Sequence, residues 1–267
     1  MMIQSESESQ AVIKMLALEK ELDSEEGNIK VAFVAGATGY VGEEVVRNLI
    51  SLGFRTVAHI RPDSFRLEKK KAYFEQLGAV VDTTPWELNA MTQTMKRIRP
   101  DAVYCLVGTT RARMKQVAEE GGSIERASYE AIDYGLTVLL ARAASDSHQS
   151  PRFVYISAIG STPWAKGSYM QAHYRAESAV LTSGLPYTVA RPVLITGPDR
   201  KENRLFERVT ARILDAVLAF ASRFGLRRLW KKYASIDAAS MAKALVKLAN
   251  NPNCANRVVE AHELRDI

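Results

Sequence analysis

The sequence contains few of the residues that covalent cross-links need. Two of its 267 residues are cysteines, Cys105 and Cys254. Two cysteines cannot form a disulfide framework, so the sequence does not belong to the small secreted proteins that disulfides stabilise. Such low cysteine usage is typical of a reducing compartment, and we expect the protein to work in the cytoplasm.

Long hydrophobic runs are absent too. No stretch approaches the roughly 18 consecutive apolar residues of a membrane-spanning helix, so we expect no transmembrane segment. The N-terminus lacks the basic-then-apolar order of a signal peptide, and we expect no such leader. The apolar and charged fractions, 47% and 25%, are those of an ordinary globular protein with a sizeable core.

Several catalytic motifs are missing as well. The sequence has neither the G-x-S-x-G turn of serine hydrolases nor a P-loop. No group of Cys, His and acidic residues has the spacing of metal ligands, so we expect no metal site. His59, His148 and His262 are scattered, and we interpret each as structural or solvated.

The net charge of +6 is unevenly distributed. Residues 1–29 carry seven acidic side chains against two lysines, whereas residues 200–232 carry ten basic side chains against three acidic ones. A basic segment attracts nucleic acid, anionic lipid or an anionic ligand. Its apolar residues are interleaved with charges and no nucleic-acid-binding motif accompanies it. We therefore favour a solvated face beside a polyanionic cofactor and expect no specific nucleic-acid binding.

The order of predicted elements indicates the fold class. Residues 1–29 form an acidic extension in which a short amphipathic helix is predicted. From Lys30 onward, strands and helices alternate. The predicted strands are 31–35, 55–60, 79–82, 102–107, 153–157 and 187–191, and the predicted helices are 40–51, 65–76, 87–97, 124–145 and 167–183. Regular alternation predicts an α/β fold, a doubly wound parallel sheet in one domain over 30–267.

The rhythm changes after Pro192. Residues 205–233 are mostly helical and basic, and they are followed by a predicted helix over 236–249 and a short strand over 257–261. Ligands of open α/β sheets bind beyond the carboxyl ends of the strands. We therefore expect residues 193–235 to form a small lid on the substrate side. The sequence does not fix the oligomeric state and is compatible with a homo-oligomer.

The most informative segment joins the first predicted strand to the first predicted helix. It reads VAFVAGATGYVG and places glycines in a G-x-x-G-x-x-G spacing. A glycine triplet alone is weak evidence, but between a strand and a helix it allows a tight turn, close approach of a pyrophosphate and tight helix packing. Amides of the first helical turn then face the anion. We predict a dinucleotide site formed by Gly36, Thr38, Gly39, Tyr40, Val41 and Gly42.

The end of the second predicted strand indicates which dinucleotide binds. NAD-binding folds usually carry an acidic residue there, which accepts a hydrogen bond from the ribose 2′-hydroxyl, but this sequence has Arg61. An arginine pairs instead with the 2′-phosphate of NADP. Asp63 complicates this interpretation because it is acidic and only two positions away, and an ordinary solvated Arg61 is the alternative. We predict NADP as the cofactor, with NAD less favoured.

Four motifs resemble those of one protein family. They are GATGYVG at 36–42, ISA at 156–158, Tyr169 with Glu177 eight residues later, and ARP at 190–192. Together they resemble the extended and atypical short-chain dehydrogenases/reductases, over most of residues 30–267. Within that family, CLVGTTR at 105–111 and Ile132-Asp133 look like the HIV Tat-interacting protein 2-like oxidoreductases. The resemblance implies an NAD(P)-binding Rossmann fold and Ser/Tyr/Lys chemistry.

The resemblance implies catalytic roles for three residues. Ser157 ends a predicted strand and would polarise a carbonyl oxygen, and Tyr169 begins a predicted helix and would give a proton to the developing alkoxide. In the family, a lysine four residues after this tyrosine lowers its pKa and holds the nicotinamide ribose. His173 takes that position here, on the same helix face as Tyr169. We expect it to bind the ribose and, being mostly neutral, to lower the tyrosine pKa less than lysine does.

Other strand ends supply further expected contacts. Asp82 ends the third predicted strand, where the family often contacts adenine. Gly108 and Thr109 follow the fourth strand and are expected to meet the cofactor, and Pro192 begins the expected lid. Arg111 either holds an anionic substrate or faces water.

Two functions therefore stay open. The first is an NADP-dependent oxidoreductase that transfers hydride between NADP(H) and a small carbonyl, alcohol or related substrate. The second is a non-catalytic NADP(H)-binding sensor or regulatory protein of the same fold, which histidine at position 173 favours. A structural interpretation, with Ser157 as a strand-end cap and Tyr169 as a half-buried aromatic residue, is the third alternative.

Overall fold

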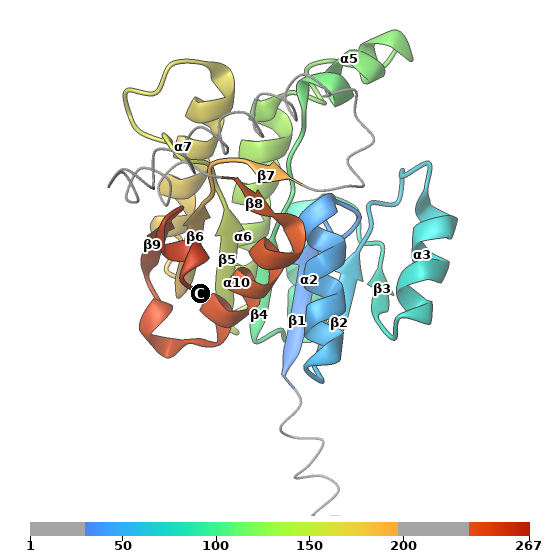
Figure 1. Ribbon diagram of the computed structural model, residues 1–267. Coiled ribbons are helices and arrows are strands. Elements are labelled where there is room, and N and C mark those ends of the chain that lie inside the picture. The colour runs from blue at the N-terminus through green and yellow to red at the C-terminus, as the bar shows by residue number, and fades with distance from the viewer. Residues whose placement is uncertain (1–29, 197–234) are drawn as a thin grey trace, which may run out of the picture. The chain divides into compact units, whose positions relative to one another are not determined.

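The computed structural model describes residues 30–196 and 235–267. The predicted N-terminal helix and nearly all of the expected lid lie outside these residues. Within them, a parallel sheet is covered by helices on both faces (Figure 1). This is the doubly wound α/β fold that the alternation of elements predicts.

The main sheet has seven strands, all parallel. They are β1 (Val31–Ala35), β2 (Arg55–His59), β3 (Val80–Asp82), β4 (Ala102–Cys105), β5 (Arg152–Ile156), β6 (Tyr187–Arg191) and β9 (Arg257–Glu260). Their spatial order is β3-β2-β1-β4-β5-β6-β9, so the strand order reverses beside β1. Ligands of such sheets bind outside the carboxyl ends of the strands, at this reversal. A small separate sheet pairs β7 (Ile195–Thr196) with β8 (Ile236–Asp237).

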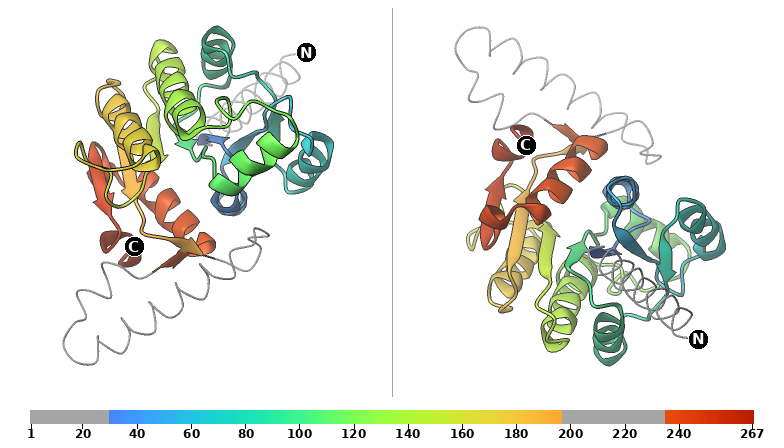
Figure 2. Two further views of the ribbon diagram at one scale, coloured as in Figure 1. Left: turned by 90° about the horizontal axis from the view of Figure 1, so that it is seen from above. Right: turned by 90° about the horizontal axis from the view of Figure 1, so that it is seen from below.

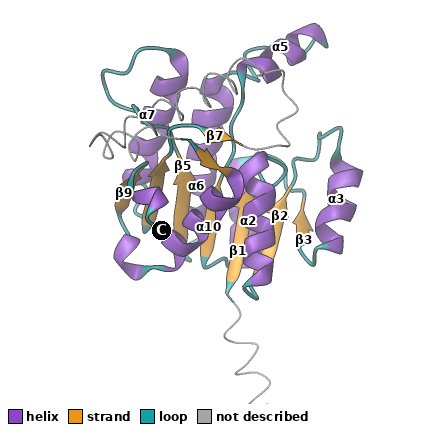
Figure 3. Cartoon of the chain, in the orientation of Figure 1, coloured by secondary structure: helices purple, strands orange, loops and turns teal. Residues whose placement is uncertain are grey.

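Helices connect the strands and form the outer layers (Figure 3). They are α2 (Tyr40–Ser51), α3 (Leu67–Gln76), α4 (Leu88–Ile98), α5 (Arg111–Glu119), the π-helix η1 (Glu130–Leu136), α6 (Thr137–Asp146), α7 (Ser168–Leu181), α10 (Ala238–Asn250) and two 3₁₀ turns, η3 (Pro252–Cys254) and η4 (Glu263–Arg265). Seen along the strands, α2 and α10 cover one face of the sheet and α6 and α7 the other (Figure 2).

The pleat of the strands divides the apolar residues between two cores. In β1, Ala32 and Val34 face the core beneath α2 and α10, whereas Phe33 and Ala35 face the core beneath α4, α6 and α7. Successive side chains of a strand point to opposite faces, so a strand buried on both sides must be apolar throughout. That is why β1 appears in the sequence as an unbroken apolar run.

One helix of the structure was not predicted, and two predicted helices differ from the structure. Helix α5 was not expected, because no described side chain in it is fully buried and its sequence has little apolar periodicity. Thr110 starts it by accepting a hydrogen bond from the Arg113 amide at 3.1 Å. The predicted helix over 124–145 is in fact the π-helix η1 followed by α6. The predicted helix over 236–249 begins at Ala238, since the two residues before it form β8 and Asp237 caps the helix.

No helix within the described ranges is both long enough and apolar enough to cross a membrane.

Candidate cofactor and catalytic site

The turn between β1 and α2 leaves no room for side chains at two of its glycines. Gly36 has a φ of +80°, and a Cβ added there would lie 2.5 Å from the carbonyl oxygen of Leu106. A Cβ at Gly42 would lie 2.2 Å from the carbonyl oxygen of Gly36, and the Gly39 amide donates to that same oxygen at 2.9 Å. Glycine is therefore required at Gly36 and Gly42. The result is a bare turn at the N-terminus of α2, which fits a pyrophosphate.

The other predicted residues of this turn are placed differently from one another. Thr38 is exposed, and Val41 is packed into the core beneath α2. The Tyr40 hydroxyl donates to the carbonyl oxygen of Thr196 at 3.1 Å. Tyr40 therefore joins the first turn of α2 to β7, at the start of the expected lid.

Arg61 lies just beyond β2 and forms an ion pair with Asp63 at 3.5 Å. The side chains of the two residues are 42% and 74% exposed, so the pair contributes little to stability and can exchange for another anion. Nearby, Phe65 is 70% exposed and lies under the guanidinium groups of Arg66 (4.8 Å) and Arg113 (5.8 Å). Because Arg113 belongs to α5, the loop that follows β2 touches the helix that follows β4 here, and both bring positive charge.

Asp82, expected to contact adenine, is held by Thr84 of the loop that follows β3 and by Arg97 of α4. Its carboxylate accepts hydrogen bonds from the Thr84 amide (3.1 Å), the Thr84 hydroxyl (2.9 Å) and Arg97 (3.3 Å). His59 is buried, and its Nε2 lies 2.8 Å from the carbonyl oxygen of Thr84, which agrees with a structural histidine. Burial lowers the pKa of His59.

The loop after β4 approaches η1 at Gly108 and Thr109. The Thr109 amide donates to Asp133 Oδ2 at 3.1 Å, and a Cβ at Gly108 would lie 3.2 Å from Asp133 Oδ1. Arg111 begins α5 and is exposed. The side of this loop that faces the interior is therefore organised by a carboxylate from η1.

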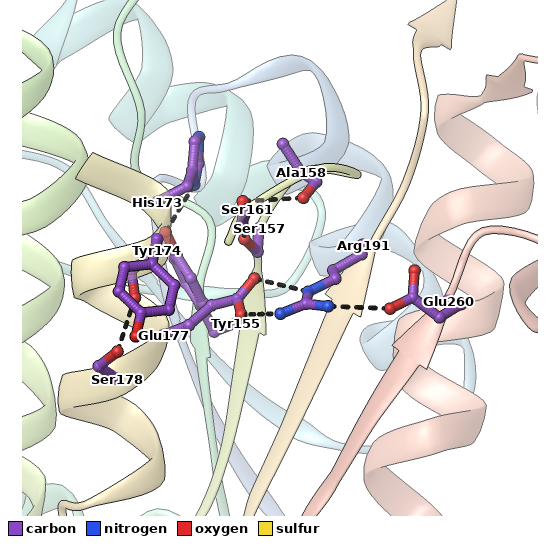
Figure 4. Close-up of polar contacts among 10 residues, drawn as sticks. All are labelled: Tyr155, Ser157, Ala158, Ser161, His173, Tyr174, Glu177, Ser178, Arg191 and Glu260. Carbon is purple, nitrogen blue, oxygen red and sulfur yellow. Dashed lines mark hydrogen bonds and ion pairs between the residues drawn. The ribbon is translucent and has the colours of Figure 1, made fainter. Parts of the chain in front are cut away.

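Ser157 follows β5 and is almost fully buried. Its Oγ lies 3.2 Å from Ser161 Oγ, and the Ser161 hydroxyl donates to the carbonyl oxygen of Ala158 at 2.8 Å (Figure 4). Since the one hydrogen of Ser161 is used in that bond, Ser157 donates to Ser161. The hydroxyl of Ser157 must turn away from Ser161 before it can donate to a substrate.

Tyr169 and His173 lie on one face of α7, as their spacing predicts. Their rings meet edge to face with centroids 4.5 Å apart, and the ring of Tyr129 packs against Tyr169 at 5.1 Å. Tyr169 is half-buried, whereas His173 is 4% exposed. The two residues are in contact, but the histidine lies deeper.

Both ring nitrogens of His173 face protein groups. Nδ1 lies 2.7 Å from the hydroxyl of Tyr155, and Nε2 lies 3.6 Å from Asp133 Oδ1 and has no hydrogen-bond partner among the described residues. Burial lowers the pKa of His173 to about 4, so the ring is neutral at neutral pH. The expected contact with the ribose stays a prediction, and any such contact has to reach this inward-facing ring.

Two site residues, Asp133 and Tyr155, had no predicted role, although Asp133 belongs to the Ile132-Asp133 motif of the resemblance. Both are buried, and burial raises the pKa of Asp133 to about 7 and that of Tyr155 well above its ordinary value. An acidic residue inside an otherwise apolar helix pattern is the sequence feature that points to Asp133. Tyr155 has no comparable feature, because an aromatic residue in a buried strand is ordinary.

Glu177 and Arg191, which belong to the family motifs, form a structural network. Arg191 donates to both carboxylate oxygens of Glu177, at 2.9 and 2.5 Å, and to Glu260 at 2.9 Å (Figure 4). The two carboxylates raise the pKa of Arg191. Pro192 directly follows Arg191, and its carbonyl oxygen accepts a hydrogen bond from the Ile159 amide at 3.0 Å. The network of Glu177, Arg191 and Glu260 joins α7 to β6 and β9. It thereby holds α7, which carries Tyr169 and His173, against the sheet.

The part of the chain that the structure describes contains no group of three or more His, Cys, Asp or Glu that could hold a metal ion.

A family model described as NAD(P)H-binding matches residues 36–216, which is more than half of the chain. The chain belongs to this NAD(P)H-binding family. The match begins at the first glycine of the β1–α2 turn and extends past β6, so it includes every strand of the sheet from β2 to β6.

Among curated relatives, the chain is similar to Protein TIC 62, chloroplastic, of two plants. The protein of Oryza sativa subsp. japonica is 30% identical over 173 residues, which is 61% of this chain and 34% of the relative. That of Pisum sativum is 26% identical over 196 residues, or 65% of this chain and 34% of the relative. The matched part of the chain thus spans about a third of the length of these relatives.

Solved structures share the fold at low identity. A putative epimerase from Burkholderia cenocepacia J2315 is 19% identical with a TM-score of 0.57, covering 84% of this chain and 73% of that one. ChuY, an anaerobillin reductase from Escherichia coli O157:H7, is 15% identical with a TM-score of 0.57 (86% and 97% covered). The Bordetella bronchiseptica enzyme WbmH in complex with NAD⁺ is 15% identical with a TM-score of 0.56, covering 84% of this chain and 73% of that one. These likenesses confirm the Rossmann fold, and the resemblance to HIV Tat-interacting protein 2-like oxidoreductases stays a prediction.

Proposed function

We propose that this protein is an NADP(H)-dependent oxidoreductase of the atypical short-chain dehydrogenase/reductase type. The observation that carries the proposal is the position of Ser157 and Tyr169. Ser157 directly follows β5, two strands from β1, and it lies at the same carboxyl edge of the sheet as the glycine turn. Tyr169 is in the first turn of the helix that follows. The substrate class is a small carbonyl compound or the corresponding alcohol.

The chain's own residues would hold the cofactor along this edge. Gly36, Gly39 and Gly42 leave room for the pyrophosphate, with Thr38, Tyr40 and Val41 in the same turn. Asp82, Gly108, Thr109 and Pro192 lie at or just beyond the carboxyl ends of other strands. When bound, NADP(H) supplies or accepts the hydride.

Arg61 supports NADP over NAD. Its guanidinium is half-exposed beyond β2 and pairs with an exposed Asp63, so it is available for the 2′-phosphate at small cost. Arg66 and Arg113 add positive charge to the same region.

The proposed proton chemistry belongs to Tyr169 and Ser157. The Tyr169 hydroxyl gives its proton to the substrate oxygen, and Ser157 turns from Ser161 to donate to the same oxygen. His173 contributes by packing its ring against Tyr169 at 4.5 Å. Because the imidazole is neutral, it does not supply the positive charge that a lysine would.

One observation favours the second candidate, a non-catalytic NADP(H)-binding sensor or regulatory protein. The pKa of His173 is lowered to about 4, so no cation stands in the lysine position at neutral pH. Without such a charge, Tyr169 keeps its proton more firmly and catalysis is slower.

Turnover and binding, measured together, decide between the candidates. We expect NADPH to bind with a fluorescence change, and a panel of small aldehydes and ketones to contain at least one compound that oxidises it. Tyr169→Phe should abolish that oxidation while NADPH still binds, because the ring contact with His173 is kept. NADPH binding without turnover of any carbonyl by the wild type would instead establish the sensor.

The proposal also covers the domain organisation and the cellular location of the protein. We propose a single domain over 30–267 with residues 193–235 as its substrate-side lid, and residues 1–29 as an acidic extension. We also propose a cytoplasmic protein without specific nucleic-acid binding. Cys105 and Cys254 are both buried and unpaired, which supports a reducing compartment.

A further inference from the structure

Asp133 occupies an unusual place in the fold. The π-helix η1 is wider than an α-helix, and such turns recur at functional sites. Within it, Asp133 points inward with 2% of its surface exposed, and its backbone carbonyl accepts the Thr137 hydroxyl at 2.7 Å. A buried carboxylate is costly unless it is paired, so its contacts are expected to have a purpose.

The two oxygens of this carboxylate face two different parts of the site. Oδ2 accepts the amide of Thr109, in the loop after β4, at 3.1 Å. Oδ1 lies 3.6 Å from Nε2 of His173 on α7, which is longer than a hydrogen bond but close enough for an electrostatic contact. Gly108 makes the approach possible, because a Cβ there would lie 3.2 Å from Oδ1.

We propose that Asp133 is a positioning residue that fixes both the loop after β4 and the tautomer of His173, and that it orients Tyr169 through that histidine. A carboxylate only accepts hydrogen bonds, so the nitrogen that faces it, Nε2, carries the ring proton. Nδ1 is then an acceptor, and the Tyr155 hydroxyl donates to it at 2.7 Å.

The effect on Tyr169 follows from packing. The imidazole lies between Asp133, 3.6 Å from Nε2, and the Tyr155 hydroxyl, 2.7 Å from Nδ1, and the ring of Tyr169 packs edge to face against it with centroids 4.5 Å apart. If the imidazole rotates, Tyr169 loses its support. The meaning of this role for catalysis rests on the proposed function, whereas the tautomer can be measured without any cofactor.

The decisive measurement is the tautomer of His173 in the cofactor-free full chain. The protein has four histidines, so ¹⁵N-histidine NMR is tractable, with His173→Gln identifying the signal. The pH should lie above 7, because burial raises the pKa of Asp133 to about 7 and the carboxylate must be ionised. We expect the Nε2–H form in the wild type.

Asp133→Asn should invert that tautomer. Its amide oxygen can still accept from Thr109, which turns its NH₂ group toward Nε2 and moves the ring proton to Nδ1. Glu263→Gln is the control, because the Glu263 carboxylate also accepts a backbone amide, that of Glu260 at 3.0 Å, but it belongs to η4 and pairs with Arg257. The control should keep Nε2–H. The same tautomer in the wild type and in Asp133→Asn, or Nδ1–H in the wild type, would overturn the proposal.

NADPH titration tests the effect on the loop after β4. Asp133→Leu loses both contacts and puts a branched apolar side chain in place of the carboxylate, and it should bind NADPH roughly tenfold more weakly, whereas Glu263→Gln should stay within about twofold of the wild type. Unchanged affinity in Asp133→Leu would remove the loop from the proposal. A wild type that binds no NADPH would refute the proposed function but leave the tautomer result to decide the role of Asp133.

Discussion

At the scale of single residues, the burial of His173 changes what this position can do. A histidine four residues after Tyr169 suggests a partner that faces the ribose, but the ring is 4% exposed and lies between Tyr155 and Asp133. The sequence predicts which face of α7 carries His173, but it does not predict how deeply the side chain is buried, because burial depends on elements far away along the chain. The contact between Tyr169 and His173 could therefore be predicted, whereas the buried partners could not.

Replacing His173 with lysine should raise any carbonyl reductase activity near neutral pH. An ammonium group at this position lies close to the Asp133 carboxylate, which compensates for its burial, and it lowers the pKa of Tyr169. The measurement is kcat against pH, with His173→Gln as the control that fills similar space without the charge. A lysine variant no faster than the glutamine variant would show that a positive charge is not what the site lacks.

Arg61→Ala should reduce the preference for NADPH over NADH. A charge-assisted hydrogen bond contributes roughly 1.5–3 kcal/mol, so the ratio of the two affinities should fall about tenfold or more. Fluorescence titration of both cofactors measures it. Arg142→Ala, which removes an exposed arginine of α6, is the control and should leave the ratio unchanged. Equal losses in Arg61→Ala for NADPH and NADH would count against a contact with the 2′-phosphate.

At the scale of elements, buried strands were the most predictable part of the molecule. Strand β1 is apolar on both faces, so its limits follow directly from the sequence. Helix α5 escaped prediction because an exposed helix has no apolar periodicity to reveal it. The π-helix escaped because one additional residue per turn changes the spacing of Asp133 and its neighbours too little to be noticed.

Glu177→Ala should destabilise the protein by about 2–3 kcal/mol, because it removes the charge-assisted hydrogen bonds between Glu177 and the partly buried Arg191, which keeps only its pair with Glu260 among the described residues. Urea denaturation followed by circular dichroism measures the change. Arg175 offers a control on the same helix, since its ion pair with Glu130 is about half exposed on both sides. Arg175→Ala should therefore cost less than about 1 kcal/mol. Similar losses in both variants would mean that the Glu177–Arg191–Glu260 network does not specifically anchor α7.

At the scale of the whole molecule, two buried groups act against each other as the pH changes. The pKa of Asp133 is raised from 3.8 to about 7, so the folded protein binds this proton more tightly, and stability falls as pH rises across that interval. The pKa of His173 is lowered from 6.5 to about 4, so stability rises with pH across its interval. Between about pH 4 and 6.5 the two contributions largely cancel.

Asp133→Asn should remove that compensation. Between pH 7 and pH 4, the unfolding free energy of the variant should fall about 3 kcal/mol further than that of the wild type. Urea denaturation at several pH values measures the difference. Asp82→Asn gives a comparison at another buried carboxylate that does not contact His173. Parallel pH profiles for the wild type and Asp133→Asn would show that Asp133 does not titrate as its burial requires.

The position of β1 within the sheet also has a consequence for how the chain folds. The ribosome makes this strand before the other strands of the sheet, and its Val31 amide donates to Asp101, which comes 70 residues later. Likewise, Arg191 can pair with Glu260 only after 69 further residues have been made. Contacts so distant in sequence close slowly, because the entropy of the intervening loop is lost before they form. During synthesis, β1, β2 and β3 can assemble as one half of the sheet before β4 is made. The edge of β1 that later pairs with β4 is then uncovered and apolar. A nascent chain stopped before β4 should consequently bind chaperones, and release should follow once Ala102–Cys105 has left the ribosome.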